Sequence, residues 1–305
     1  MRYSALFLLL LLATSAAQGA PFLRGADISS LPRVEAVGAR FTEDSATRDP
    51  LQILKDAGAN TIRLRLWHTP AGGYCGRAAT LDMAERAHKN GLRILLDFHY
   101  SATWADPGHQ QEPAAWRGLP LGVLADSVRI HTRDVLLDLR QRGIAPVMVQ
   151  LGSEITGGML WDSGRVTGAF DKPERWDHLA TVLKAGAEGG AEAFPGRGTP
   201  GIMLHLDAGG NNAACRHFLD RVLAREVPCD AIGLSYYPWW HGTHNPVGQK
   251  NHLLPGYPDT PAGQAAFLDT LRQVVVAVPD GHGRGIIYWE PAWVAARGSV
   301  RPGRI

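Results

Sequence analysis

The chain has 305 residues and a formal net charge of +2, from 31 Lys and Arg against 29 Asp and Glu. The basic residues are scattered and do not alternate with aromatic residues, which argues against a nucleic-acid partner. No stretch after the N-terminus is apolar enough to cross a bilayer, so we expect no membrane partner. The length fits a single (β/α)8 barrel.

Residues 1–19 predict a secretory signal peptide. Arg2 precedes a leucine-rich run, and small residues at Ala17 and Gly19 suit cleavage before Ala20. The apolar run is too short to span a membrane comfortably. We therefore expect a secreted or periplasmic monomer with a single catalytic domain over residues 20–305.

The chain has three cysteines, an odd number for an exported protein. Cys215 and Cys229 could form one disulfide, but their spacing cannot decide this, and buried or free thiols are the simpler alternative. No cysteine or histidine has zinc-ligand spacing.

Short apolar runs alternate with longer helical patterns along the whole chain. Glycines follow three of the helical patterns, at Gly58, Gly91 and Gly143, where helices often end. Strands and helices that alternate at this spacing predict right-handed βαβ units and a parallel sheet. The expected strands are Phe22–Ser29, Asn60–Trp67, Arg93–Tyr100, Ala145–Glu154, Gly201–Asp207, Asp230–Pro238 and Gly285–Glu290. The expected helices lie near 50–57, 80–90, 122–142, 174–193, 211–225 and 261–278.

One strand is missing from this series if the barrel is to close. Residues 239–260 are rich in Pro, Gly and His and have neither a helix nor a strand period. The sequence after Glu290 is too short for a full closing helix. We expect an incomplete (β/α)8 TIM barrel, whose seventh strand region and C-terminal helix are missing or degenerate. Val274–Val278 is β-branched enough to serve as a substitute strand, although it continues a helical pattern.

Polar residues recur at the carboxyl ends of the expected strands, where barrel enzymes place their active sites. Buried strands are usually apolar, so these residues indicate a solvated cleft. Glu154 stands out as a lone carboxylate after an apolar run, and partial burial would raise its pKa into the range of a general acid. The residues are Asp27, Arg63, Arg65, Trp67, Asp97, His99, Gln150, Glu154, His205, Asp207, Tyr288 and Glu290.

Tryptophans also concentrate in the segments that follow strand ends, where flat rings can stack on sugars; the alternative is that they are core anchors. Carboxylates, histidines and tryptophans without a metal-ligand motif favour carbohydrate chemistry. A metal site at His205, Asp207 and His99 is the competing interpretation.

Seven motifs resemble the endo-β-1,4-galactanases of glycoside hydrolase family 53, in the family's order, from about residue 22 to 293. They are GADISSL at 25–31, NTIRLRLW at 60–67, LLDFHYSATWADPGHQ at 95–110, VQLGSEITGGMLW at 149–161, IMLHLD at 202–207, IGLSYYPWWHGT at 232–243 and IIYWEPAW at 286–293. The resemblance implies a (β/α)8 barrel that hydrolyses β-1,4-galactan in type I arabinogalactan with retention of configuration.

The resemblance also implies roles for individual residues. Glu154 takes the place of the acid/base. The implied substrate-binding residues are Arg65, Asp97, His99, Ser153, Tyr236, Tyr237, Trp240 and Trp289. No cofactor is implied; some relatives carry calcium in a loop near the last strand, but the end of this chain offers no ligand set for it.

The chain departs from the family pattern in two places. Ser153 stands where the family has an Asn that binds the sugar 2-hydroxyl. The segment that carries the catalytic nucleophile is absent after Thr243, so no nucleophile is found and Arg65 is expected to lack its usual carboxylate partner. Glu290 belongs to a separate motif, and with Asp207 and Asp280 it is a weak substitute.

Three hypotheses follow for the function of the chain. It is an exported galactan hydrolase, a galactan-binding protein without turnover, or the product of a deleted or wrongly assembled gene that folds poorly. A retaining glycosidase needs two carboxyl groups about 5–5.5 Å apart, so the missing segment bears directly on the choice.

Overall fold

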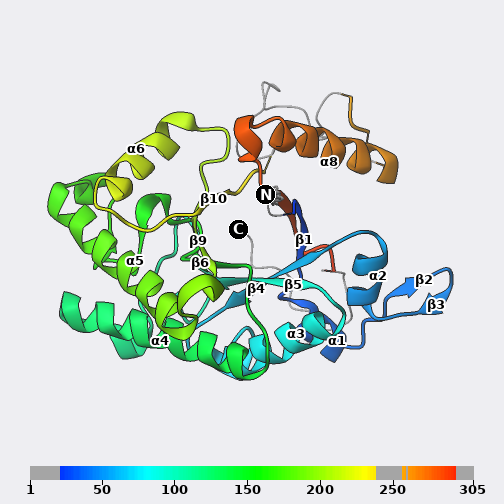
Figure 1. The fold of residues 1–305 in the computed structure, drawn as a ribbon, viewed down its shortest axis with the longest axis horizontal. Helices are drawn as coiled ribbons and strands as arrows, with labels where there is room; N and C mark the ends of the chain where they lie inside the picture. Colours follow the sequence, from blue (N-terminus) through cyan, green and yellow to red (C-terminus); the bar gives the residue numbers. More distant parts are fainter. Residues whose placement is uncertain (1–20, 238–255, 259, 293–305) are drawn as a thin grey trace, which may run out of the picture.

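The apolar runs form one curled parallel sheet (Figure 1). The computed structural model describes residues 21–237, 256–258 and 260–292. Its seven sheet strands coincide with the seven expected runs, and they pair in the order β10-β9-β6-β5-β4-β1-β11. Their bounds are β1 Leu23–Asp27, β4 Thr61–Leu66, β5 Arg93–Phe98, β6 Met148–Leu151, β9 Gly201–Leu206, β10 Ala231–Leu234 and β11 Gly285–Trp289.

Helices lie on the outer side of the curled sheet (Figure 1). Gly58, Gly91 and Gly143 follow helix ends with positive φ, as their positions in the sequence predict. Gly189 lets two long helices, α4 and α5, approach closely, because a Cβ there would lie 2.4 Å from the Arg129 carbonyl oxygen. The helices are α1 Leu31–Ala36, α2 Pro50–Asp56, α3 Arg77–Lys89, α4 Leu121–Gln141, α5 Pro173–Ala193, α6 Asn212–Leu223 and α8 Pro261–Val276.

Smaller elements lie in the loops and were not expected from the sequence. Two short hairpins pair β2 (Thr42–Glu43) with β3 (Ala46–Thr47), and β7 (Gly158–Met159) with β8 (Gly164–Arg165). The second hairpin follows β6 after Glu154 and a short helical turn at Ile155–Gly157.

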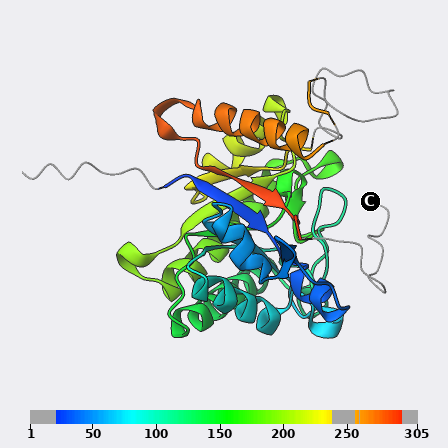
Figure 2. The ribbon, with the colours of Figure 1, turned by 90° about the vertical axis from the view of Figure 1, so that its right-hand side faces the viewer.

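The first and last strands of the sheet lie side by side (Figure 2). Asp27 at the end of β1 pairs in register with Trp289 of β11 and with Arg63 of β4. The strand that comes first in the sequence, β1, and the strand that comes last, β11, are therefore neighbours at one edge of the sheet. The carboxyl end of β11 therefore lies beside that of β1.

The core has two parts, one on each face of the sheet. The outward side chains of β4, such as Ile62 and Leu64, pack in the large core beneath the helices. Leu95, Met148 and Met203 form a small apolar cluster on the inner face. The polar side chains at the carboxyl ends of the strands lie above this inner cluster.

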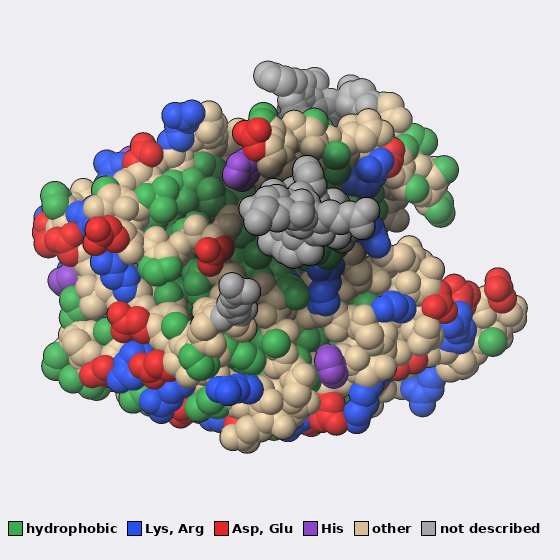
Figure 3. Space-filling model, viewed as in Figure 1, with side chains coloured by type: hydrophobic (Ala, Val, Ile, Leu, Met, Phe, Trp, Pro, Cys, Tyr) green, Lys and Arg blue, Asp and Glu red, His purple; other side chains and the backbone are tan. Residues whose placement is uncertain are grey.

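Strands β10 and β11 are the two edges of the sheet, and no described residues pair them. Their neighbourhood is less covered than the rest: Ile232 and Leu234 of β10 are 48% and 50% exposed, whereas every residue of β4 is buried. Helix α8 buries only Gly263 and carries apolar side chains at the surface (Figure 3).

Residues 239–260, where the missing strand is expected, lie mostly outside the described residues, and so does the expected signal peptide at 1–19. The α/β class and the curled parallel sheet are confirmed, while the incompleteness of the barrel stays a prediction. The substitute strand at Val274–Val278 is wrong, because the α8 ladder continues until the Ala277 N–H bonds the Gln273 carbonyl. In the described part of the chain, no helix is long and apolar enough to cross a membrane.

Candidate active site

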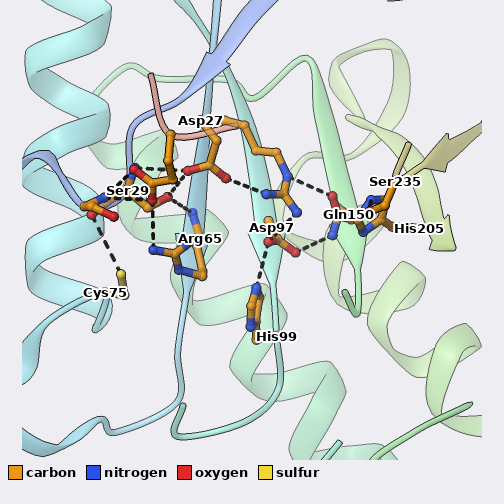
Figure 4. Close-up of polar contacts among 12 residues, drawn as sticks. Asp27, Ser29, Arg65, Cys75, Asp97, His99, Gln150, His205 and Ser235 are labelled. Carbon is orange, nitrogen blue, oxygen red and sulfur yellow. Dashed lines mark hydrogen bonds and ion pairs between the residues drawn. The ribbon is translucent and has the colours of Figure 1, made fainter. Parts of the chain in front are cut away.

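A buried polar network crosses the inner face of the sheet at the carboxyl ends of four strands (Figure 4). Arg63 of β4 forms ion pairs with Asp27 of β1 and with Asp97 of β5, the latter at 2.7 Å. Its Nε also donates to Gln150 of β6 at 3.1 Å, and Gln150 donates to Asp97 at 2.5 Å. Burial would raise the pKa of Asp97, but Arg63, His99 and His205 together outweigh burial and hold that pKa below its usual range.

His99 follows β5 and is fixed by three partners. Its Nε2 lies 2.9 Å from Asp97, and its Nδ1 accepts hydrogen bonds from the Trp67 indole and the Ala105 backbone N–H. Burial lowers the pKa of His99. The ring is therefore neutral near pH 7, with its proton on Nε2, and neither nitrogen is open to a metal.

Arg65 and Glu290 form a second buried ion pair, beside the first network. Glu290 follows β11 with φ 48° and accepts from Arg65 Nη2 at 3.1 Å and from the Ser30 N–H. Burial raises the pKa of Glu290 to about 7, Asp27 adds to the shift and Arg65 opposes it. Arg65 thus pairs with Glu290, a contact that the sequence did not predict, because the left-handed turn at Glu290 points that side chain inward. The expected loss of its partner on the nucleophile segment stays a prediction.

Glu154 lies just past β6, in a left-handed conformation with φ 54°. Its Oε1 accepts a hydrogen bond from the Ser235 hydroxyl at 2.5 Å, and its backbone N–H donates to His205 Nδ1 at 3.2 Å. Burial raises the pKa of Glu154, the nearby Asp207 carboxylate raises it further and the Ser235 hydrogen bond opposes them. A carboxyl group with a raised pKa can hold a proton near neutral pH and deliver it.

Gln110 fixes the backbone of the Glu154 loop, a role that the sequence did not reveal. Its side-chain amide donates to the carbonyl oxygens of Ser153 at 2.7 Å, Asp106 at 3.1 Å and Glu154 at 3.4 Å. Ser153 itself is buried. The left-handed turn that presents Glu154 is therefore held from the loop after β5.

Aromatic rings border the two ion-pair networks. Trp104 stacks over the Arg65 guanidinium, with the ring centroid 4.0 Å from Cζ, and lies 6.3 Å from the Trp289 ring. Trp289 in turn meets Tyr237 edge to face at 6.3 Å. Burial raises the pKa of Tyr237 to about 12, so its hydroxyl stays protonated and can donate. Tyr236 lies beside Tyr237, after β10.

Strand alternation misplaces Tyr288, and the role of Trp240, which the family resemblance implied as a substrate-binding residue, stays a prediction. Tyr288 was placed on the same face as Glu290, but its hydroxyl accepts a hydrogen bond from Gln264 of α8 at 2.6 Å. The prediction is wrong because Glu290 leaves the extended conformation and the alternation ends there. Trp240 lies outside the described residues.

The three cysteines are free thiols, so Cys215 and Cys229 form no disulfide. Within the described residues, no three His, Cys, Asp or Glu side chains converge as metal ligands do. This includes the alternative site at His205, Asp207 and His99, since His99 already uses both ring nitrogens.

Comparison with known proteins places this site in a family. The model of glycosyl hydrolase family 53 matches residues 23–250 and 242–303. The chain belongs to this family.

Relatives extend the family match over most of the chain. An uncharacterized protein in the bgaB 5′ region of Niallia circulans is 40% identical over 314 residues, covering 90% of this chain and 85% of that protein. The arabinogalactan endo-β-1,4-galactanase A of Aspergillus niger is 33% identical over 315 residues, covering 90% and 87%. That of Thermothelomyces thermophilus is 30% identical over 308 residues, covering 89% and 90%.

Solved structures of family 53 superpose well. A fungal β-1,4-galactanase gives a TM-score of 0.80 at 30% identity and covers 89% of this chain and 90% of its own. The family 53 catalytic domain of Ignisphaera aggregans gives 0.82 at 30% identity, covering 93% and 89%. The resemblance drawn from the sequence motifs is confirmed, and with it the assignment to the glycoside hydrolases.

Proposed function

We propose that this family 53 chain takes β-1,4-galactan into the mouth of the curled sheet and uses Glu154 as its proton donor. The environment of the Glu154 carboxyl carries this proposal. It is a partly buried carboxyl at the end of a parallel strand, its pKa is raised, and a hydroxyl holds one of its oxygens. The galactanase names of the relatives supply the substrate class.

The chemistry follows from the protonation state of Glu154. A protonated Glu154 donates to the glycosidic oxygen as the bond to the anomeric carbon breaks, and its carboxylate then activates water as a base. The Asp207 carboxylate nearby favours the protonated form before the reaction. In a retaining reaction, which the family resemblance implies, a second carboxylate attacks the anomeric carbon.

Sugar binding rests on the residues around Glu154. Trp289 offers an aromatic face near Trp104 and Tyr237. His99, which contacts the Trp104 ring, and its partner Asp97 supply polar and charged groups. We assign substrate contacts to Arg65, Asp97, His99, Ser153, Tyr236, Tyr237, Trp240 and Trp289. Ser153 is shorter than the Asn usual in the family, so we expect a weaker contact with the sugar 2-hydroxyl.

Release of reducing ends from β-1,4-galactan tests this activity. The wild-type chain should release them faster than Glu154→Gln, which keeps the size of the side chain but has no acidic proton to transfer to the leaving group. Equal rates for the two proteins at all pH values would refute hydrolysis by this chain.

A second candidate function is galactan binding without turnover, because the chain lacks the family's nucleophile segment after Thr243. The family match supports this view: it comes in two pieces whose ranges overlap at residues 242–250. The Niallia alignment supports it too, since it extends over 314 residues while covering 90% of a 305-residue chain. The relative therefore has residues with no counterpart here.

The contacts of Arg65 point the same way. Its Nε and Nη1 are buried and have no hydrogen-bond partner among the described residues, although Nη2 contacts Glu290 and Tyr74. If Arg65 has lost a second carboxylate partner, two of its buried nitrogens are expected to lack hydrogen-bond acceptors, as observed within the described part of the chain. Strands β10 and β11, which no described residues pair with each other, and the half-exposed Ile232 and Leu234 fit an incomplete barrel.

Calorimetric titration with galactotetraose distinguishes binding from inertness. We expect binding that weakens about tenfold in Trp289→Ala, the size of one lost aromatic contact. Val274→Ala on the exposed face of α8 is the control and should bind as the wild type does. Absence of heat up to millimolar ligand would refute this function.

A third hypothesis, a wrongly assembled gene product, makes a separate claim about folding. A cooperative thermal transition of the purified chain would contradict it, and sequencing the transcript across the codons for residues 243–249 would show whether the gap is real.

We further propose that residues 1–19 direct export and that residues 20–305 form one monomeric catalytic domain without a cofactor. Mass analysis of the secreted N-terminus tests the export.

A further inference from the structure

The geometry points to Ser235 and His205 as positioning residues that orient the Glu154 carboxyl group and fix which of its oxygens carries the proton. This inference rests on the proposed role of Glu154 as proton donor. Neither residue belongs to the substrate-binding set assigned above. They come from two neighbouring strands, β9 and the end of β10 (Figure 4).

The three residues form a closed ring of hydrogen bonds. The Glu154 backbone N–H donates to His205 Nδ1 at 3.2 Å. His205 Nε2 lies 3.1 Å from Ser235 Oγ, and Ser235 Oγ donates to Glu154 Oε1 at 2.5 Å. The ring begins and ends on Glu154, so it ties the carboxyl group to the backbone of its own residue.

Each bond in the ring has a defined direction. A backbone N–H can only donate, so His205 Nδ1 is an acceptor and the proton of the neutral ring is on Nε2. Burial lowers the pKa of His205 to about 3, with Arg63 adding to the shift, which keeps the ring neutral. Nε2–H therefore donates to Ser235 Oγ, and the single hydroxyl proton of Ser235 is directed at Glu154 Oε1.

This direction assigns the acid proton of Glu154. Oε1 accepts from Ser235, so a protonated Glu154 carries its proton on Oε2. Oε2 is then the atom that passes the proton to the glycosidic oxygen, and the carboxylate that remains is stabilised by the Ser235 hydroxyl. A carboxyl group without this contact could place its proton on either oxygen.

Other charges around Glu154 would remain if the ring were broken. Asp207 after β9 and Asp106 in the loop after β5 raise its pKa, while Arg63 of β4 lowers it. Tyr237 beyond β10 is close enough for the Glu154 charge to raise the tyrosine's own pKa. Removing Ser235 takes away an opposing hydrogen bond and leaves the two acidic neighbours, so the pKa of Glu154 should rise.

Carbon-detected NMR titration of 13C-labelled glutamate measures this directly in the full chain, with the Glu154 signal identified by its loss in Glu154→Gln. Ser235→Ala should raise the Glu154 pKa by about one unit, a normal effect of one lost hydrogen bond to a carboxylate. His205→Ala should raise it less, because Ser235 is then free to rotate. The double variant should match Ser235→Ala, since the ring acts through Ser235.

Conservative and remote variants separate positioning from general damage. Ser235→Thr keeps a hydroxyl and should keep the wild-type pKa of Glu154. Ser127→Ala is the control and should leave that pKa unchanged, because the Ser127 hydroxyl lies on α4 and donates to the Val123 carbonyl of the same helix. A folded Ser235→Ala protein with an unchanged Glu154 pKa would overturn the inference, as would equal shifts in Ser235→Ala and Ser235→Thr.

The NMR measurement needs no substrate, so its result is independent of the proposed function. A shift in the Glu154 pKa in Ser235→Ala, together with no galactan binding and no hydrolysis, would support the hydrogen-bonded ring and refute galactan as the ligand. Galactan binding without a pKa shift would sustain the proposed function and refute the ring.

Discussion

The Arg65 guanidinium and the Glu290 carboxylate meet at 3.1 Å inside the curled sheet, with side chains that are 1% and 0% exposed. The contact joins β4 to the turn that follows β11, two segments far apart in the sequence. Glu290 also accepts from the Ser30 N–H after β1, so one carboxylate connects three neighbouring strand ends. Burying these charges is tolerable only while both partners are present.

Removing one partner of this pair should therefore destabilise the chain strongly. Arg65→Met leaves Glu290 buried without its ion pair, and we expect a loss of about 3–5 kcal/mol in the free energy of unfolding. The double variant Arg65→Met, Glu290→Met should recover part of this loss, because no charge remains buried. Urea unfolding of the two single variants and the double variant measures the coupling, and additive losses would show that the pair does not act as a unit.

Glu290 should also make stability depend on pH. Its pKa in the folded chain is about 7, above the ordinary glutamate value of 4.5, so the folded state binds more protons than the unfolded state between these values. The free energy of unfolding should then decrease as pH rises from about 4.5 to about 7, by roughly 1–3 kcal/mol. Glu290→Gln cannot ionise, and its stability should be flatter over this range in the same unfolding experiment. An equally steep decrease in the variant would assign the effect to another group.

Gln110 should be required for the shape of the Glu154 loop. Gln110→Ala removes donors to three backbone carbonyls, and we expect a loss of about 1–3 kcal/mol in unfolding free energy. Gln110→Glu should be worse at pH 7, because its carboxylate would face the same carbonyl oxygens. Thermal unfolding of both variants at pH 7 tests the order, and a more stable Gln110→Glu would contradict the role of the amide as donor.

Most of the fold follows from local patterns in the sequence. The strands are apolar runs, the long helices have a clear period, and three glycines mark helix ends, so each could be placed by its own residues. Helix α1 is short and begins beside Pro32, and the hairpins have two-residue strands, so neither shows a period. Such elements depend on the surrounding packing.

The candidate site could be predicted only in part, because its geometry depends on turns and on contacts between distant segments. The strand-end residues Asp27, Arg63 and Asp97 stand out because polar groups are rare in buried strands. Glu154 and Glu290 were recognised, but their left-handed backbones were not, and strand alternation therefore misplaced Tyr288. Ser235 and Gln110 lie within the quoted motifs, but the sequence does not show their contacts with the Glu154 segment, because these join parts of the chain that are far apart in sequence.

An added anion should restore bond cleavage if the chain lacks its nucleophile. With a dinitrophenyl β-galactobioside, whose leaving group needs no proton, azide or formate can attack the anomeric carbon and release the dinitrophenolate. We expect about tenfold faster release in molar azide or formate than without it, and an α-glycosyl azide as the azide product. Arg65→Met should reduce this rescue, because Nε and Nη1 of Arg65, which have no partner among the described residues, are donors for an anion. Circular dichroism checks that the variant is folded. Fast release without added anion, together with labelling of one carboxylate by a 2-fluoro-galactosyl fluoride, would instead show that a nucleophile is present and identify it.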